Sequence, residues 1–393
     1  MKTPSFIKVA EREMALIGSS KSNRNLLLIV PLVVFLLLGF IYQKGALREI
    51  SVAVFDEDHT TLSRTIIQFI DASPAMKITY SLSSQDDLTK FFLQHDERAI
   101  FRIPRNLMND VIKGKASRVQ VLTNSNNIVF GNILLREAYM ISGTVSAGAS
   151  IQRLQAEGLT EKQAFNLALP IRVNSKPLFN PIYNYLYYLL PGLMTVLLQM
   201  IMFFVATRAI NSEFVNGSFD DLVEISGGSA LNILVGKALA YFFVGFGLIM
   251  FIAIVFMFFG IPFKEKEMEL ILLFSYFILV NIFLGLMLSA TLDDEIMSLD
   301  IAFFYNSPAF VFSGFTFPLF GMPFFDTLYA QFIPYTHFLH AFFKLYQVGT
   351  PFSYIKPELF VLSIFLFTAM FTAWLALHIR IKGDQKVKQL SLA

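Results

Sequence analysis

Apolar residues in this chain fall into long runs, and one extended segment of mixed polarity separates the first run from the others. The first run covers 25–42, and the mixed segment extends from 43 to 181. A helix needs about 20 apolar residues to cross the hydrocarbon core of a bilayer. We therefore predict an α-helical polytopic membrane protein with six membrane helices and a domain inserted after the first. The five later helices are expected at 182–207, 233–259, 270–291, 301–320 and 359–378.

Strands and helices alternate in the mixed segment, which predicts an α/β domain. Short β-branched runs indicate the strands, and apolar residues at helical spacing indicate the helices. The segment is long enough to build a core of its own. The expected strands are 50–55, 76–82, 99–103, 119–122 and 171–173, and the expected helices are 60–70, 85–93, 107–112, 127–155 and one that opens at Thr160.

Residues 5–17 place apolar and charged side chains at helical spacing, which is typical of an amphipathic helix at a membrane surface. Lys8, Glu11, Arg12 and Glu13 are expected on its polar face. Basic residues precede the first membrane helix and recur in the tail at 380–393, so the positive-inside rule places both termini in the cytoplasm. The α/β domain is then extracytoplasmic.

Pro308, Gly314 and Pro318 interrupt the helix expected at 301–320, and the aromatic-rich stretch 321–357 is too broken to span. Discontinuous helices at membrane depth usually face protein or a cavity, because their freed backbone groups need partners. We expect the stretch 321–357 to be partly re-entrant.

Composition supports membrane residence and excludes several kinds of chemistry. Charged residues make up 15% of the chain, whereas soluble domains carry about a quarter. The net charge of +2 is too small to indicate nucleic-acid binding. The chain has no cysteine, which excludes disulfides, thiolate catalysis and cysteine-ligated metals. It also lacks a Walker A motif, a Gly-x-Ser-x-Gly elbow and a His-Glu-x-x-His motif.

Two groups of residues offer a metal site, and for both we favour an interpretation without metal. Asp56, Asp58 and His59 supply ligands for a hard cation, but Asp56 ends a strand and Asp58 is placed to cap the following helix. His337 and His340 have helical spacing for a zinc pair, but no third ligand lies near them. We expect no metal site.

Polar residues within the expected spans are few, and the three amides among them are not ionisable, which argues against a proton- or sodium-coupled carrier. Gln199, Asn281 and Asn306 are the amides at membrane depth. Hydrogen bonds between helices are the favoured interpretation for all three, and a substrate pathway is the alternative. The segment 211–237 combines acidic residues with Phe214 and Phe219, and we interpret it as an amphipathic docking element rather than a solvated loop.

Six short motifs follow one another along nearly the whole chain. They lie at 52–64, 183–192, 213–222, 236–237, 313–323 and 334–336. In this order and spacing they resemble the membrane subunits of type-two ABC exporters that carry a large extracytoplasmic domain. Departures from the family pattern concern the docking segment, where Val215 replaces an acid, Ser218 replaces a Thr, and 226–228 lack the usual Pro.

The resemblance implies a half-transporter in a bacterial inner membrane. Two permease subunits would pair, as a homodimer or with a paralogue, and separate ABC ATPase subunits would bind ATP and Mg and dock on the cytoplasmic loops. The cargo would be a hydrophobic or amphipathic compound such as a drug or a lipid, exported with or without a periplasmic adaptor. The chain would contact membrane lipids and no nucleic acid, and it would not itself be an enzyme.

The resemblance also implies roles for particular residues. ATPase coupling would involve Glu213, Gly217, Ser218, Asp221, Leu222 and Lys237. The substrate pathway would involve Gln199, Asn281, Asn306, Ser313, Gly314 and Phe317. The alternative hypothesis is a membrane-anchored sensor or scaffold whose α/β domain binds an extracytoplasmic ligand. An enzyme acting on lipid is disfavoured, because the spans hold no ionisable cluster.

Overall fold

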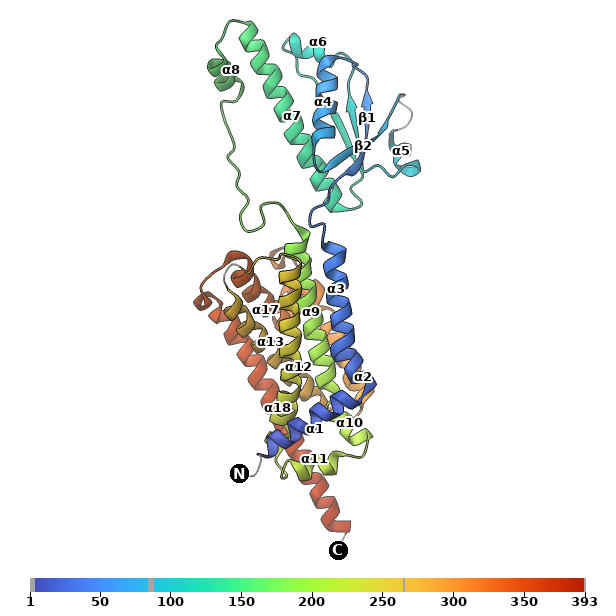
Figure 1. Ribbon diagram of the computed structural model, residues 1–393, viewed down its shortest axis with the longest axis vertical. Helices are drawn as coiled ribbons and strands as arrows, with labels where there is room; N and C mark the ends of the chain where they lie inside the picture. Colours follow the sequence, from blue (N-terminus) through green and yellow to red (C-terminus); the bar gives the residue numbers. More distant parts are fainter. Residues whose placement is uncertain (1–3, 84–87, 264–265, 392–393) are drawn as a thin grey trace. The chain divides into compact units, whose positions relative to one another are not determined.

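The computed structural model describes residues 4–83, 88–263 and 266–391, and the chain divides into two compact units (Figure 1). The membrane unit comprises Met1–Gly45 and Pro177–Ala393, and the α/β unit comprises Ala46–Lys176. Each unit has its own hydrophobic core.

The α/β unit is built on a four-stranded mixed sheet with the strand order β2-β1-β3-β4. The central strand β1 pairs in parallel with both β2 and β3, whereas β4 is antiparallel to β3. Its elements are β1 Ile50–Asp56, α4 Thr61–Ala72, β2 Met76–Ser81, α5 Leu88–Gln94, β3 Ala99–Ile103, α6 Leu107–Ile112, β4 Gln120–Thr123, α7 Ile128–Ala156 and α8 Glu161–Ala168.

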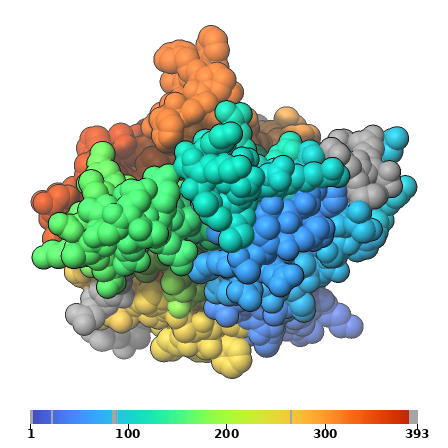
Figure 2. Space-filling model, turned by 90° about the horizontal axis from the view of Figure 1, so that it is seen from above, coloured from blue at the N-terminus to red at the C-terminus, as the bar shows by residue number. Residues whose placement is uncertain are grey.

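Helices cover both faces of this sheet. Side chains of α4 and α7 pack on Val52, Val54 and Phe101 to form the larger core, and α5 packs on the opposite face through Phe91. Figure 2 shows the teal segment that follows β3 lying against the blue segment that contains α4. The strand expected at 171–173 is wrong: these residues form no strand and are exposed, with Ile171 at 85%. The expected helix start at 85–87 lies outside the described residues.

The membrane unit is helical throughout its described elements. Its elements are α1 Ser5–Ser19, α2 Lys21–Arg24, η1 Asn25–Ile29, α3 Val30–Tyr42, α9 Tyr185–Arg208, α10 Asn211–Val215, α11 Phe219–Ile225, α12 Ala230–Phe258, α13 Glu267–Thr291, α14 Glu295–Asn306, α15 Ala309–Phe312, η2 Leu319–Gly321, α16 Phe324–Gln331, α17 Pro334–Phe343, η3 Lys344–Val348, η4 Phe352–Ile355 and α18 Lys356–Ser391.

Five helical segments of the described chain are long and apolar enough to cross a membrane, one fewer than we expected from the sequence. They are Asn25–Tyr42, Tyr185–Val215, Ala230–Phe258, Glu267–Thr291 and Phe352–Gly383. The interruption expected within 301–320 is confirmed, because α14 ends at Asn306 and only the four-residue α15 follows Pro308. Proline has no N–H group to continue the helix, and Gly314 then adopts a left-handed backbone with φ of 89°.

Helices α9 and α13 form the centre of this unit, and α13 packs between α9 and α18 (Figure 1). Small residues allow the close contact: a Cβ at Gly285 of α13 would lie 2.5 Å from the backbone oxygen of Phe203 in α9. Only 22% of the residues are buried in the most apolar windows of the spans that contain α3 and α18. The amphipathic helix α1 packs along the first turns of α12.

The stretch between α14 and α18 folds back on itself. The Tyr305 hydroxyl of α14 donates a hydrogen bond to the carbonyl oxygen of Phe332, at 2.6 Å, where α16 ends. Helix α17 then begins at Pro334 and is buried against α13 and α18. The chain after α15 therefore returns to the level of α14 before it reaches α18.

Candidate functional site

The connection between α9 and α12 is a compact pair of short helices. The backbone N–H groups of Ile210 and Asn211 both donate to the Ser289 hydroxyl of α13, at 2.9 and 3.0 Å, where the chain turns out of α9. Gly217 separates α10 from α11 with a φ of 66°, a conformation that glycine adopts without strain. Phe214 and Phe219 stack across this turn with their ring centroids 4.1 Å apart. The turn is thus fixed to the membrane helices.

A buried network of ion pairs joins this connection to α1 and α12. The Arg12 guanidinium donates two hydrogen bonds to the Glu213 carboxylate, at 2.7 and 2.8 Å. The Lys237 ammonium donates to Glu213 at 2.8 Å and also to Glu13, and the Tyr241 hydroxyl donates to the other oxygen of Glu13. We call Arg12, Glu13, Glu213 and Lys237 the ionic cluster. Two carboxylates and two cations balance its charge.

Burial makes each member of the ionic cluster depend on the others. Lys237 is 0% exposed, Glu213 2% and Glu13 4%. Removing one partner from a buried ion pair leaves an uncompensated charge and costs about 3–5 kcal/mol. The hydrogen bond to Glu213 raises the pKa of the Arg12 guanidinium above its usual value, so this cation stays charged at any neutral pH.

Gly236 brings α1 close enough to α12 for these contacts. A Cβ at Gly236 would lie 2.6 Å from both the backbone oxygen of Phe6 and the Cβ of Val9. Glycine therefore lets the two backbones approach, and the neighbouring Lys237 reaches across to both acids. Gly236 and Lys237 therefore act together: Gly236 sets the distance between α1 and α12, and Lys237 supplies the positive charge.

The predicted coupling residues fall into two groups. Glu213, Ser218 and Lys237 are brought together, since the Ser218 hydroxyl donates to Glu213 at 2.5 Å. Leu222 is buried, whereas Gly217 and Asp221 are exposed. The exposed side of α10 and α11 also carries Val215, Asn216, Asp220 and Glu224. We call these six exposed residues the α10–α11 surface.

Sequence reasoning missed two members of the ionic cluster. Arg12 and Glu13 were expected on the polar face of α1, but Glu13 is buried in line with Val9 and Ile17. The residues 9, 13 and 17 are four apart and therefore share one side of a helix. That spacing, together with an isolated lysine at the start of an apolar helix, was the available signal for a buried ion pair.

Of the residues predicted for a substrate pathway, Gln199 and Asn306 share a hydrogen bond. The Gln199 amide of α9 donates to the Asn306 side-chain oxygen of α14 at 2.9 Å, in agreement with a hydrogen bond between helices. Asn281 donates to Phe277 of its own helix. Ser313 is buried, Gly314 takes the left-handed turn, and Phe317 is half exposed. Within the described chain, the Ser313 hydroxyl and the Asn281 side-chain oxygen have no hydrogen-bond partner.

The acidic turn after β1 is occupied by contacts within the α/β unit. The Asp56 carboxylate accepts hydrogen bonds from the backbone N–H groups of Asp58 and His59 and from the Ser63 hydroxyl, at 2.8–3.1 Å. Thr60, rather than Asp58, caps α4, and its side chain forms a capping box with Ser63. The described residues contain no group of three or more His, Cys, Asp or Glu that would hold a metal.

His337 and His340 have different surroundings in α17. His337 is buried, and its ring nitrogen lies 3.0 Å from the carbonyl oxygen of Gln331. His340 is exposed. The two histidines therefore belong to the packing and the surface of an aromatic helix.

Comparison with known proteins agrees with this architecture. The family described as ABC-2 family transporter protein matches residues 24–375. The probable multidrug ABC transporter permease YbhS of Escherichia coli K12 is 22% identical over 331 residues, which cover 82% of this chain and 84% of that protein. YbhS of Escherichia coli O157:H7 matches to the same extent. The chain therefore belongs to the ABC-2 family and is a membrane permease subunit, of the kind that lacks ATPase activity and works with ATPase subunits.

Proposed function

We propose that this chain is the permease subunit of an ATP-driven exporter and that the α10–α11 surface receives its ATPase. The observation that carries the proposal is the ionic cluster, which connects α10 rigidly to α1 and α12. A displacement of α10 by the ATPase would act on Glu213 and, through it, on Lys237 of the membrane helix. Nucleotide binding would then bias the bundle between two conformations.

Side-chain contacts support six crossings with both termini on one side. Asp293, just after α13, pairs at 2.7 Å with Arg380, which lies near the end of the apolar span Phe352–Gly383, so α13 and this span end at the same level. The segment between them must then return across the unit, which makes the broken α14–α17 segment the remaining crossing. Arg12 lies at this same end through its contact with Glu213. The basic residues at both ends favour the cytoplasm for this side, and the α/β unit would then be extracytoplasmic.

The finer assignments follow from the family and its relatives. YbhS is named as a probable multidrug permease, which supports export of a hydrophobic or amphipathic compound from a bacterial inner membrane. Two permease subunits would pair, as a homodimer or with a paralogue, and ATP and Mg would bind to the ATPase. The unpartnered side-chain oxygens of Gln199, Asn281 and Ser313 are polar atoms available to a substrate at membrane depth.

Single cysteines test the proposal cleanly, because the natural chain contains none. Val215→Cys and Glu224→Cys lie on the α10–α11 surface, and we expect both to crosslink to the co-purified ATPase with a short bifunctional maleimide. Glu267→Cys is the matched exposed control. It lies at the start of α13, a helix about 37 Å long whose other end contacts the chain that leads into α10. We expect no crosslink there. A membrane-impermeant maleimide should label Glu267→Cys in intact cells and Val215→Cys only after permeabilisation.

Two results would contradict the proposal. Equal crosslinking from all three positions would remove the docking assignment. A folded chain that reproducibly purifies without any ATPase would favour the sensor or scaffold hypothesis.

A further inference from the structure

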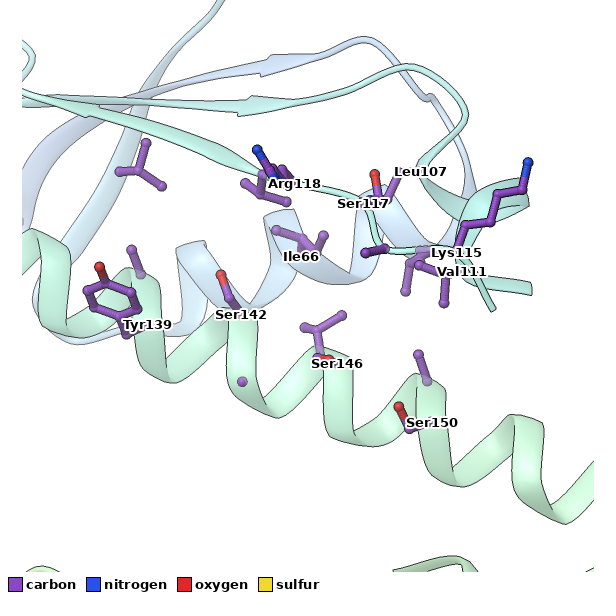
Figure 3. A pocket seen from close by; sticks show the side chains of 18 of the residues that line it. Ile66, Leu107, Val111, Lys115, Ser117, Arg118, Tyr139, Ser142, Ser146 and Ser150 are labelled. Atoms are coloured by element: carbon purple, nitrogen blue, oxygen red, sulfur yellow. The ribbon is translucent and has the colours of Figure 1, made fainter. Parts of the chain in front are cut away.

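The α/β unit contains a groove that neither the family nor the exporter proposal explains. It has a volume of about 910 Å³ and lies between α7 and the segment that runs from α6 into β4 (Figure 3). Ile66 of α4, Leu107 and Val111 of α6, and Val121 of β4 supply its apolar lining. Pockets of about 300–1,000 Å³ with mostly apolar walls and a few polar groups are typical of small-molecule sites.

Helix α7 presents its small residues to this groove. Ser142, Ser146 and Ser150 follow one another along the side of α7 that faces Ile66 and Val111 (Figure 3). Gly143 also lines the groove, and a Cβ added there would have no atom within 4 Å. The helix therefore leaves room for a ligand and offers hydroxyl groups along it.

All charged residues that line the groove are cations: Lys115, Arg118 and Arg153. Lys115 and Arg118 have no ionic partner in the described part of the chain, and Arg153 has only a distant contact of 3.9 Å with Glu157. The Arg153 guanidinium reaches the loop opposite, where it lies 2.8 Å from the position of a Cβ at Gly114. Uncompensated cations at an apolar groove favour a ligand that carries negative charge.

We propose that this groove binds a small amphipathic anion. Its aliphatic or aromatic tail lies between α4 and α7, and its carboxylate, sulfate or phosphate group is held by Arg118 and Arg153, with Lys115 at the rim. The apolar lining and the absence of acids among the described residues that line the groove carry this assignment. It goes beyond the proposed export function and does not depend on the ATPase.

A photoreactive fatty acid tests the site on the full chain, purified in discs of phosphatidylcholine. We expect its diazirine tail to label peptides within 107–121 and 138–153, and its uncharged methyl ester to label them weakly. The variant Lys115→Gln/Arg118→Gln/Arg153→Gln should lose about tenfold or more in labelling, because charge-assisted hydrogen bonds are removed. The variant Lys77→Gln/Lys113→Gln/Lys162→Gln removes three exposed cations that do not line the groove, and it should label like the natural chain.

A second pair of variants blocks the groove without changing charge. Gly143→Trp fills it and should abolish labelling, whereas Gly148→Trp lies on the same helix outside the groove and should not. Competition by soluble unlabelled fatty acid, or by phosphatidylglycerol in the disc, identifies whether a free amphiphile or a lipid is the ligand, and either result supports the site. The proposal is overturned if the natural chain and both charge variants are labelled equally, or if the methyl ester labels the groove as strongly as the fatty acid does. Displacement of the probe only by an acidic peptide would assign the groove to a protein partner instead.

Discussion

The ionic cluster and the Gln199–Asn306 amide pair are both buried in the membrane unit, yet they differ in charge and in the segments they join. The ionic cluster connects two segments outside the long helices, α1 and α10, to the start of α12. The amide pair connects α9 directly to the broken helix α14. The ionic cluster therefore holds α1 and α10 against the helix bundle, whereas the amide pair joins two helices within the bundle.

The energetic difference between them is large. Breaking a buried ion pair costs about 3–5 kcal/mol, because a charge is left without a partner. Hydrogen bonds between membrane helices contribute about 0.6 kcal/mol on average. Because its contacts are costly to break, the ionic cluster stays intact when α10 is displaced and passes that displacement to α12. Neutral amides can exchange hydrogen-bond partners at low cost. This difference fits force transmission at the first site and rearrangement at the second.

The largest effect is expected from Lys237→Met. The change leaves Glu13 without a cation and Glu213 with Arg12 alone, so the free energy of unfolding should fall by about 3–5 kcal/mol. Thermal unfolding in mild detergent measures the loss. Stimulation of the partner ATPase should fall with it, because α10 is no longer held to α12.

The double variant Glu13→Gln/Lys237→Met is the control for the ionic cluster. It removes one acid with the cation and keeps the pair between Arg12 and Glu213, so it should recover part of the lost stability. An additive effect, with the double variant as unstable as the sum of the two single variants, would show that the groups are not coupled.

An intermediate effect is expected from Gly236→Ala. The new methyl group would lie 2.6 Å from Phe6 and Val9 of α1, so α1 must move away from α12. Overpacking of this kind costs about 1–3 kcal/mol. Gly247→Ala is the matched control in the same helix, because its methyl group would meet no atom within 4 Å.

Proteolysis of α1 separates the two glycine variants. Gly236→Ala should expose α1 to protease at the membrane surface, and Gly247→Ala should not. If both behave alike, close packing of α1 on α12 is not what holds the ionic cluster together.

Much of the fold could be predicted from the sequence, because apolar runs and turn residues are local signals. The helix bounds Leu107–Ile112 agree with the prediction, and most strands of the α/β unit were placed within one residue. The expected strand at 171–173 failed, because its β-branched residues are exposed and pair with no strand. The interruption of the segment 301–320 was predicted correctly, because Pro308 and Gly314 are local signals that end α14 at Asn306 and set a left-handed turn.

The candidate site could be predicted only in part. Glu213, Ser218 and Lys237 were identified through a resemblance in motifs, and the structure places them in contact. Arg12 and Glu13 were assigned to a solvent-facing side, since their partners lie about 200 residues away in the chain. Two signals in the sequence point to such a pairing, the four-residue spacing of Val9, Glu13 and Ile17 and the requirement that a buried lysine find an acid, and neither identifies the partner.

The smallest effect is expected from Gln199→Leu and Asn306→Leu. Each single variant should lower the free energy of unfolding by about 1 kcal/mol, because it leaves a buried amide without its partner. The double variant removes both polar groups and should be close to neutral, as apolar side chains suit the bundle. Thermal unfolding separates these cases. If transport by the intact complex falls in the double variant while its stability does not, the amides act on substrate or on helix movement; unchanged transport would leave them a role in packing alone, and the contrast with the ionic cluster would then be one of strength only.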